Sequence, residues 1–168
     1  MSERFSSVIT IGGKVQVADV PELIEAINAE EIGIEWDESH FEPGSAADLL
    51  EALEGGLLVL TDHERSWGAL SDLEPLLQKK GIAYDVHVEG KYEYDGELRR
   101  FRPGLGFFSQ PTLNDGCEAV CPESSLREVL ALMCREQHRT AQEKLNAILG
   151  PEIPVLEPFE IVETAVRS

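Results

Sequence analysis

Positive charge is missing from a long stretch of this chain. No lysine or arginine lies between Lys14 and Arg65, yet the stretch carries fourteen carboxylates. They are Asp19, Glu22, Glu25, Glu30, Glu31, Glu35, Asp37, Glu38, Glu42, Asp48, Glu51, Glu54, Asp62 and Glu64. Over the whole 168 residues, 32 acidic against 14 basic side chains give a formal net charge of −18. Binding to phosphate groups needs clusters of lysine and arginine, so this composition argues against direct binding to nucleic acid or to an anionic membrane.

Three further features are scarce. The apolar runs are much shorter than a membrane-spanning helix, and no basic segment followed by an apolar one opens the chain. There are only three cysteines, an odd number that argues against a disulfide framework and for a reducing compartment. We therefore expect a soluble, cytoplasmic protein without membrane contact.

Apolar residues are plentiful enough for a core, at 42% of the chain, so the acidity does not imply disorder. The length predicts one compact domain over residues 1–150. Residues 151–168 contain Pro151, Pro154 and Pro158 and are predicted to form an extended tail, with an edge strand at Phe159 to Val162 as an option.

Periodicity predicts an α+β fold, with α/β left open. Strands are expected at 8–11 and 14–17 around a Gly12-Gly13 hairpin turn, and at 32–36, 57–60 and 82–89. A further hairpin is expected over 92–98, with its turn at Asp95-Gly96. Helices are expected after Asp19, over 45–54 with Ser45 as N-cap, and over 71–80. Segments 57–89 and 8–36 resemble βαβ units, which favours a mixed sheet in a ferredoxin-like sandwich. The helix at 45–54 fits that sandwich poorly. Residues 103–120 are expected to be loop, with one short strand as an option.

The longest predicted helix covers about 123–149. Its apolar stripe contains Leu126, Leu130, Met133 and Leu145, which suffices for one partner surface. That partner is most simply the protein's own sheet, and a homodimer assembled through this helix is the alternative.

Cys117, Cys121, Cys134 and His138 have a spacing typical of zinc ligands. Cys134 and His138, four apart on the expected helix, would share a face. If the helix began at Pro122, however, Cys121 would lie about 20 Å from Cys134 along its axis, too far for one metal. Cys134 could equally be an ordinary small apolar residue. We predict no cofactor, and zinc at these residues remains an alternative.

Two histidines have neighbours suited to acid–base chemistry. His87 lies between Asp85 and Glu89 on one face of the strand expected at 82–89. The same pattern is typical of a sheet face exposed to solvent. His63 follows the buried strand at 57–60 and has Asp62 and Glu64 beside it. No phosphate-binding glycine loop or nucleophile motif accompanies either residue.

The carboxylates of the lysine-free stretch are predicted to lie on the outer faces of ordered helices and strands. The binding surface expected from them comprises Glu22, Glu25, Glu30, Glu31, Asp37, Glu38, Asp48, Glu51 and Glu54. The one basic cluster, Lys91, Arg99, Arg100 and Arg102, either pairs with nearby acids or docks on the acidic face of another copy.

The sequence therefore favours a non-catalytic protein whose acidic surface binds a basic protein, such as a nucleic-acid-binding target that it inhibits by mimicking phosphate. Acidity that serves only solubility is the simpler explanation of the same composition. The alternative from another class is a metal-dependent enzyme or sensor that uses His63, His87 or the cysteine group.

Overall fold

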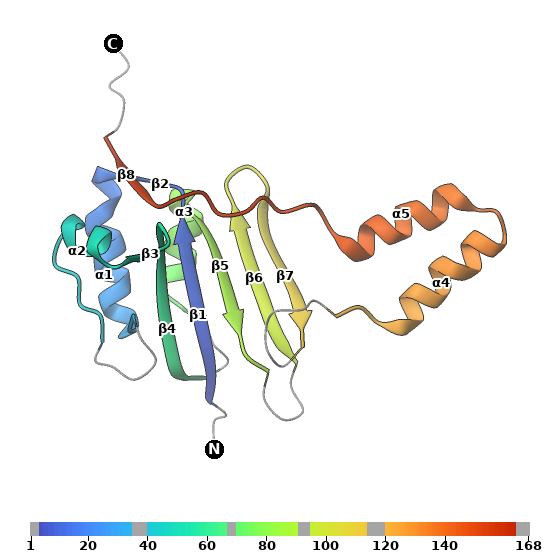
Figure 1. Cartoon of the computed structure of the whole chain (residues 1–168), viewed down its shortest axis with the longest axis horizontal. Helices are drawn as coiled ribbons and strands as arrows, with labels where there is room; N and C mark the ends of the chain where they lie inside the picture. The colour runs from blue at the N-terminus through green and yellow to red at the C-terminus, as the bar shows by residue number, and fades with distance from the viewer. Residues whose placement is uncertain (1–3, 35–39, 67–69, 91–94, 114–119, 164–168) are drawn as a thin grey trace, which may run out of the picture.

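A computed structural model describes residues 4–34, 40–66, 70–90, 95–113 and 120–163 of the chain. Its centre is a six-stranded sheet in the order β3-β4-β1-β5-β6-β7 (Figure 1). The strands are β1 Arg4–Gly12, β3 Leu53–Glu54, β4 Leu57–Ser66, β5 Ala83–Val88, β6 Gly96–Arg102 and β7 Gly106–Thr112. Every neighbouring pair in this sheet is antiparallel. The predicted α+β class is confirmed, whereas the predicted mixed sheet is wrong.

The chain crosses the sheet twice through helices. α1, Val20–Glu30, connects β1 to the β3–β4 hairpin, and α3, Leu73–Lys80, connects β4 to β5. β4 and β5 therefore flank β1 instead of pairing with each other. The strand predicted at 32–36 does not form over its described part, where Gly33 makes only an isolated bridge with Thr61; Glu35 and Trp36 lie outside the described residues. This bridge holds the segment after α1 beside β4.

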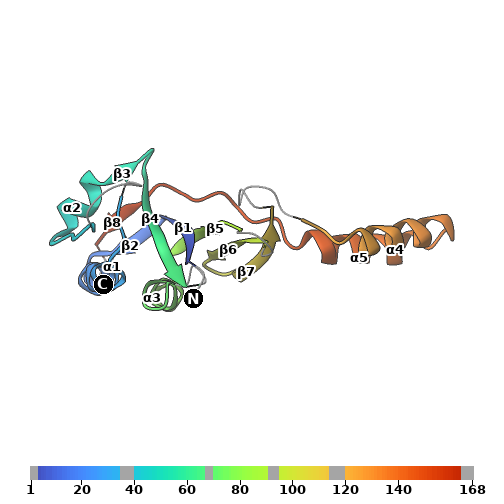
Figure 2. The same cartoon turned by 90° about the horizontal axis from the view of Figure 1, so that it is seen from below.

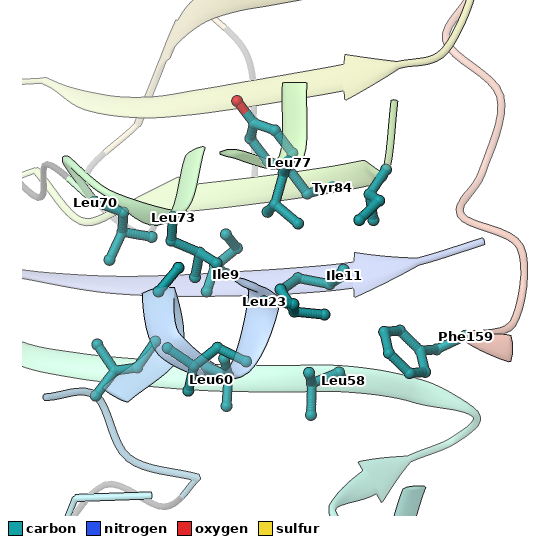
Figure 3. Close-up of a cluster of buried hydrophobic side chains, with 14 of the residues drawn as sticks. Ile9, Ile11, Leu23, Leu58, Leu60, Leu70, Leu73, Leu77, Tyr84 and Phe159 are labelled. Carbon is teal, nitrogen blue, oxygen red and sulfur yellow. The ribbon is translucent and has the colours of Figure 1, made fainter. Parts of the chain in front are cut away.

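Helices α1 and α3 cover one face of the sheet, and the core lies between these helices and that face (Figures 2 and 3). Alternation places Ile9 and Ile11 of β1 on that face, level with Leu60 and Leu58 of β4. Tyr84 and Val86 of β5, and Leu23, Ile27, Leu73 and Leu77 of the helices, complete its centre. The period-two pattern of the strands and the apolar stripes of the helices were both readable from sequence, because each depends on near neighbours alone.

Two shorter features also agree with local sequence signals. α2, Ala46–Glu51, begins with the expected Ser45, whose side chain accepts from Asp48 N–H while the Asp48 carboxylate accepts from Ser45 N–H. Gly81, with φ of 68°, ends α3 as predicted. The segment 103–120 was expected to be loop with room for one short strand, and it contributes one strand, the seven-residue β7.

The long helix predicted over 123–149 is wrong, because the chain forms two helices instead. α4, Glu123–Cys134, and α5, His138–Leu149, fold back on each other as a helical hairpin, here called the arm. Glu136 adopts a left-handed φ of 58° at the turn. Folding back buries Val129 and Ala141 between the helices, which a straight helix extending from the sheet would leave in water. None of the described helices is long and apolar enough to cross a membrane.

After the arm, an extended tail returns across one end of the sheet (Figure 1). It ends in β8, Glu160–Val162, which pairs in parallel with β2, Lys14–Gln16. The hairpin predicted around Gly12-Gly13 is therefore wrong: β2 leaves the sheet and pairs with a strand almost 150 residues later. A short 3-10 helix, η1 Val17–Asp19, leads from β2 into α1.

Candidate interaction surface

The exposed carboxylates of the lysine-free stretch lie on elements at one end of the molecule. α1, α2, β3 and β8 occupy this end, and the arm projects from the opposite one (Figures 1 and 2). We call the exposed glutamates here the acidic end: Glu25, Glu31, Glu42, Glu51 and Glu54. Within the part of the chain that the structure describes, no ion pair involves any of the five. Their charge therefore faces solvent.

Helix periodicity explains the orientation of Glu25. α1 buries Val20, Leu23 and Ile27 against the sheet, so positions 22 and 25 face outward. On α2, Leu49 is buried and Glu51 is exposed, for the same reason. Because Glu25 and Glu51 lie on helices that pack against the core, the fold fixes the spacing between them.

Two predicted members of the surface are engaged within the protein. Glu22 shares the ammonium group of Lys80 with Asp19; Lys80 Nζ lies 2.6 Å from Glu22 Oε1 and 2.7 Å from Asp19 Oδ1. Lys80 donates both hydrogen bonds, and they raise its pKa, the one to Asp19 having the larger effect. Asp48 uses its carboxylate in the cap of α2, where the N–H of Gly44 and interactions with Ser45 lower its pKa. Neither offers a free carboxylate to a partner.

Glu30 is a third predicted member and is not on the surface at all. Only 1% of it is exposed, and its Oε1 accepts hydrogen bonds from the backbone N–H groups of Asp72 and Leu73. The prediction is wrong because Glu30 lies on the buried stripe of α1, at the point where that helix meets the start of α3. Asp37 and Glu38 lie outside the described residues.

The tail adds a carboxylate that sequence reasoning did not assign to this end. Phe159 N–H donates to the carbonyl of Gly56, at the turn between β3 and β4, and this brings the exposed Glu160 to the same region. Lys14 lies opposite Glu160 in the β2–β8 register. No local signal in the tail could have indicated this placement, because it depends on pairing between the two ends of the chain.

Two members of the predicted basic cluster, Arg99 and Arg102, form ion pairs within the protein. Arg99 makes two hydrogen bonds to Glu74, of 2.7 and 3.2 Å, and one of 2.9 Å to Glu97. Burial opposes the charged guanidinium, but the contacts with Glu74 and Glu97 outweigh it and raise the pKa of Arg99. Arg102 is buried and its Nη1 lies 2.8 Å from Asp85 Oδ1. Lys91 lies outside the described residues. Because Arg99 and Arg102 are already engaged, docking of this cluster on another copy's acidic face is not favoured.

The described members of the predicted metal site are not brought together. Cys121, Cys134 and His138 are all exposed, and Cys117 lies outside the described residues. Cys134 and His138 do not share a helical face, because α4 ends at the first and α5 begins at the second. Across the described ranges, no group of three or more histidine, cysteine or acidic side chains has a metal-binding arrangement.

The side chain of only one of the two candidate histidines, His87, is described. His87 lies on the face of the sheet away from α1 and α3, level with Val8 of β1 and Leu98 of β6. Of His63, only the backbone within β4 is described.

A cavity of about 390 Å³ opens where the tail crosses the sheet, and His87 does not line it. Its lining residues are Gly13, Lys14, Gly81, Ala83, Arg102, Pro103, Leu105, Pro154, Val155 and Glu157. Arg102 is already engaged there by Pro154 O, Tyr84 O and Asp85. Its guanidinium thus serves to hold the tail, and the lining contains no histidine or cysteine for catalysis.

Comparison with known proteins identifies no relative: no family model, curated protein or solved structure matches this chain.

Proposed function

We propose that this protein is a non-catalytic binding protein whose acidic end docks on a basic surface of another protein. The observation that supports the proposal is a set of exposed glutamates, Glu25, Glu31, Glu42, Glu51 and Glu54, without ion-pair partners in the described structure. They lie on α1, α2 and β3 and in the segments that adjoin these elements. Carboxylates already fixed in space lose less conformational entropy on binding than those on a mobile tail. Their field also steers a cationic partner toward this end.

The partner class we propose is a nucleic-acid-binding protein. Such a protein has a basic groove that follows the closely spaced phosphates of a duplex or single strand, and a rigid row of carboxylates can occupy it. A cytoplasmic location belongs to the same proposal. The exposed free thiols of Cys121 and Cys134 support it, since such thiols persist in reducing compartments.

A ferredoxin-like sandwich is the fold we propose for the core. The order β3-β4-β1-β5, with α1 and α3 on one face, supports it, because this is a βαββαβ chain in which each crossover spans one antiparallel neighbour. β6 and β7 would then extend the sheet, and α2 would be an insertion before β3.

The proposed binding is tested by removing three charges from the acidic end. The variant Glu25→Gln/Glu51→Gln/Glu54→Gln is compared with Glu89→Gln/Asp95→Asn/Glu152→Gln, whose exposed acids lie between β5 and β6 and after α5. Both variants carry the same net charge. Each immobilised protein is exposed to lysate of the source cells, and bound proteins are eluted with a salt gradient or with duplex DNA. Exposed substitutions of this kind change stability by only about 0.5 kcal/mol, so folding is retained.

We expect the unmodified chain and the second variant to retain the same basic proteins, which rising salt or duplex DNA releases, and the first variant to lose them. Equal retention by the two variants would refute the proposal. So would retention that persists at about 1 M salt, where charges are screened within roughly 3 Å.

The metal-dependent alternative is not proposed, because no observation on the described residues favours it. Its candidate side chains lie on the open sheet face, at the turn of the arm and before α4, rather than around a common point.

A further inference from the structure

The arm leaves most of its apolar side chains in water. Leu130, Met133 and Leu149 are 59%, 51% and 68% exposed, and Leu126 and Leu145 are exposed as well. Only Val129 and Ala141 of the two helices are buried. The principal contacts of α4 and α5 are with each other, and the arm extends away from the sheet (Figures 1 and 2). The apolar stripe of the arm thus has no partner within the described chain.

These five side chains lie on one face of the arm. On α4, Leu126, Leu130 and Met133 fall within about 60° of one another around the helix axis, to one side of the buried Val129. Glu128 lies on the other side of Val129 and forms an ion pair with Lys144 of α5. One face of the hairpin therefore carries this ion pair, and the opposite face carries the leucines and Met133.

The positions of the side chains on α5 also place its leucines on the face opposite the ion pair. Around its axis, Leu145 and Leu149 lie within about 80° of the buried Ala141 on one side, and Lys144 lies about 60° away on the other. Leucines from both helices therefore form a continuous apolar face. We call it the apolar face of the arm: Leu126, Leu130, Met133, Leu145 and Leu149.

Charge identifies what this face can bind. Residues 123–149 contain four acidic and four basic side chains, so the arm is neutral while the rest of the chain carries the whole net charge of −18. They are Glu123, Glu128, Glu136 and Glu143, with Arg127, Arg135, Arg139 and Lys144. A basic partner would be drawn to the acidic remainder of the molecule. Two arms, by contrast, can approach each other without repulsion between their own charges.

The sheet's uncovered face is a poor alternative partner for the arm. The register places Thr10, Asp85 and Arg100 side by side on this face, and His87 and Gln110 lie on the same side among the apolar Val8, Leu98 and Phe108. Covering these polar groups with leucine side chains would strip them of water without replacing their hydrogen bonds. The apolar face of the arm is better matched by an identical face.

We propose that two copies of this protein associate through the apolar faces of their arms, about a two-fold axis, to form a four-helix bundle. Antiparallel helix pairs with apolar facing stripes pack in this way, and a two-fold interface uses the same patch twice. The two sheets would lie at opposite ends of the dimer, with each acidic end still exposed. The inference does not depend on the proposed binding to a basic protein.

The size of the face predicts weak, reversible pairing. Helices of twelve residues are about 18 Å long and each about 10 Å wide, which gives a face of roughly 360 Å² in projection. Standard interfaces bury about 600 Å² or more per partner, and smaller ones are typical of transient association. We therefore expect a dissociation constant on the order of 100 micromolar.

Sedimentation equilibrium between about 1 µM and about 1 mM protein tests the proposal. The expected result is a shift from a mass of 18.6 kDa toward twice that value as concentration rises. Leu130→Glu should weaken association at least tenfold, because the two-fold axis places two charges in the apolar interface. The matched control is Ala131→Glu, which adds the same charge at an exposed position of α4, about 140° from Leu126 around the axis and outside the apolar face. It should leave pairing almost unchanged.

Salt provides a second readout that separates this proposal from binding at the acidic end. Pairing of two copies with a net charge of −18 each should strengthen as salt rises, because their mutual repulsion is screened. Binding of the acidic end to a basic protein should weaken. A mass of 18.6 kDa at every concentration would overturn the proposal. Equal effects of Leu130→Glu and Ala131→Glu on association would overturn it as well. Circular dichroism checks that all of the proteins have the same helical content.

Discussion

Glu30 is the last residue of α1, and its carboxylate lies inside the fold at the start of α3. Its Oε1 accepts hydrogen bonds of 2.7 Å from Asp72 N–H and 3.0 Å from Leu73 N–H. Asp72 occupies the N-cap position of α3, but its own side chain makes no capping bond. A carboxylate from another helix thus satisfies the first N–H groups of α3 and interacts favourably with the positive end of its dipole.

Replacing Glu30 by alanine should lower the free energy of unfolding by about 2–4 kcal/mol, because two backbone donors near the core lose their acceptor and a cavity remains. Urea unfolding followed by circular dichroism measures the change. Glu25→Ala is the matched control: it removes a carboxylate from the exposed side of the same helix and should cost at most about 0.5 kcal/mol. Equal midpoints for the two variants would contradict the capping role of Glu30.

At the level of the elements, the tail is the segment that closes one end of the core. Phe159 is 3% exposed and fills the space beside Leu58 (Figure 3). Arg102 Nε donates to Pro154 O at 2.8 Å, and Gly13 N–H donates to Glu157 O at 2.8 Å. Gly12 allows the tail to approach this closely, because a Cβ at that position would lie 2.4 Å from Glu157 O.

Gly12→Ala should therefore displace the tail and destabilise the protein by about 1–3 kcal/mol, the usual cost of an overpacked site. Limited proteolysis should then cleave the tail faster, and urea unfolding should begin at a lower concentration. Gly44→Ala serves as the control, since its added Cβ would meet Asp48 Oδ2 at an ordinary 3.6 Å. If both substitutions leave proteolysis of the tail unchanged, close packing at Gly12 is not what holds it.

For the whole molecule, the uneven distribution of charge is the dominant property. The arm is neutral, and the sheet with its helices and tail carries the net charge of −18. Self-repulsion among like charges destabilises a compact state, and salt screens it over a Debye length of about 10 Å at 0.1 M. The protein's stability should therefore depend on ionic strength.

Raising sodium chloride from about 10 mM to about 300 mM should increase the melting temperature by roughly 3–6 °C. The melting curves are best recorded by circular dichroism at about 1 µM protein, where pairing of arms contributes little. The variant Glu25→Gln/Glu51→Gln/Glu54→Gln has less repulsion to screen and should show a smaller increase. A melting temperature that falls or stays constant with salt would show that repulsion does not limit stability.

Several elements could be predicted from sequence because their signals are local. The alternating residues of β5, the capping box of Ser45 and Asp48, and the Gly81 stop of α3 each involve residues only a few positions apart. The outward orientation of Glu25 and Glu51 followed in the same way from helix periodicity. For the same reason the α+β class and most of the acidic end were accessible without a structure.

The chain's sequence by itself determined its charge segregation, its core-forming strands and helices, and the exposure of several carboxylates, because these depend on composition and on near neighbours. Tertiary structure alone decided that β2 pairs with β8, that Glu30 is buried beneath α3, and that the helix predicted over 123–149 folds back at Glu136. Each of these outcomes depends on contacts between residues whose separation in the chain no periodic pattern records. The arm illustrates the difference: helical periodicity predicted its apolar stripe, whereas only the fold showed that the sheet does not cover that stripe.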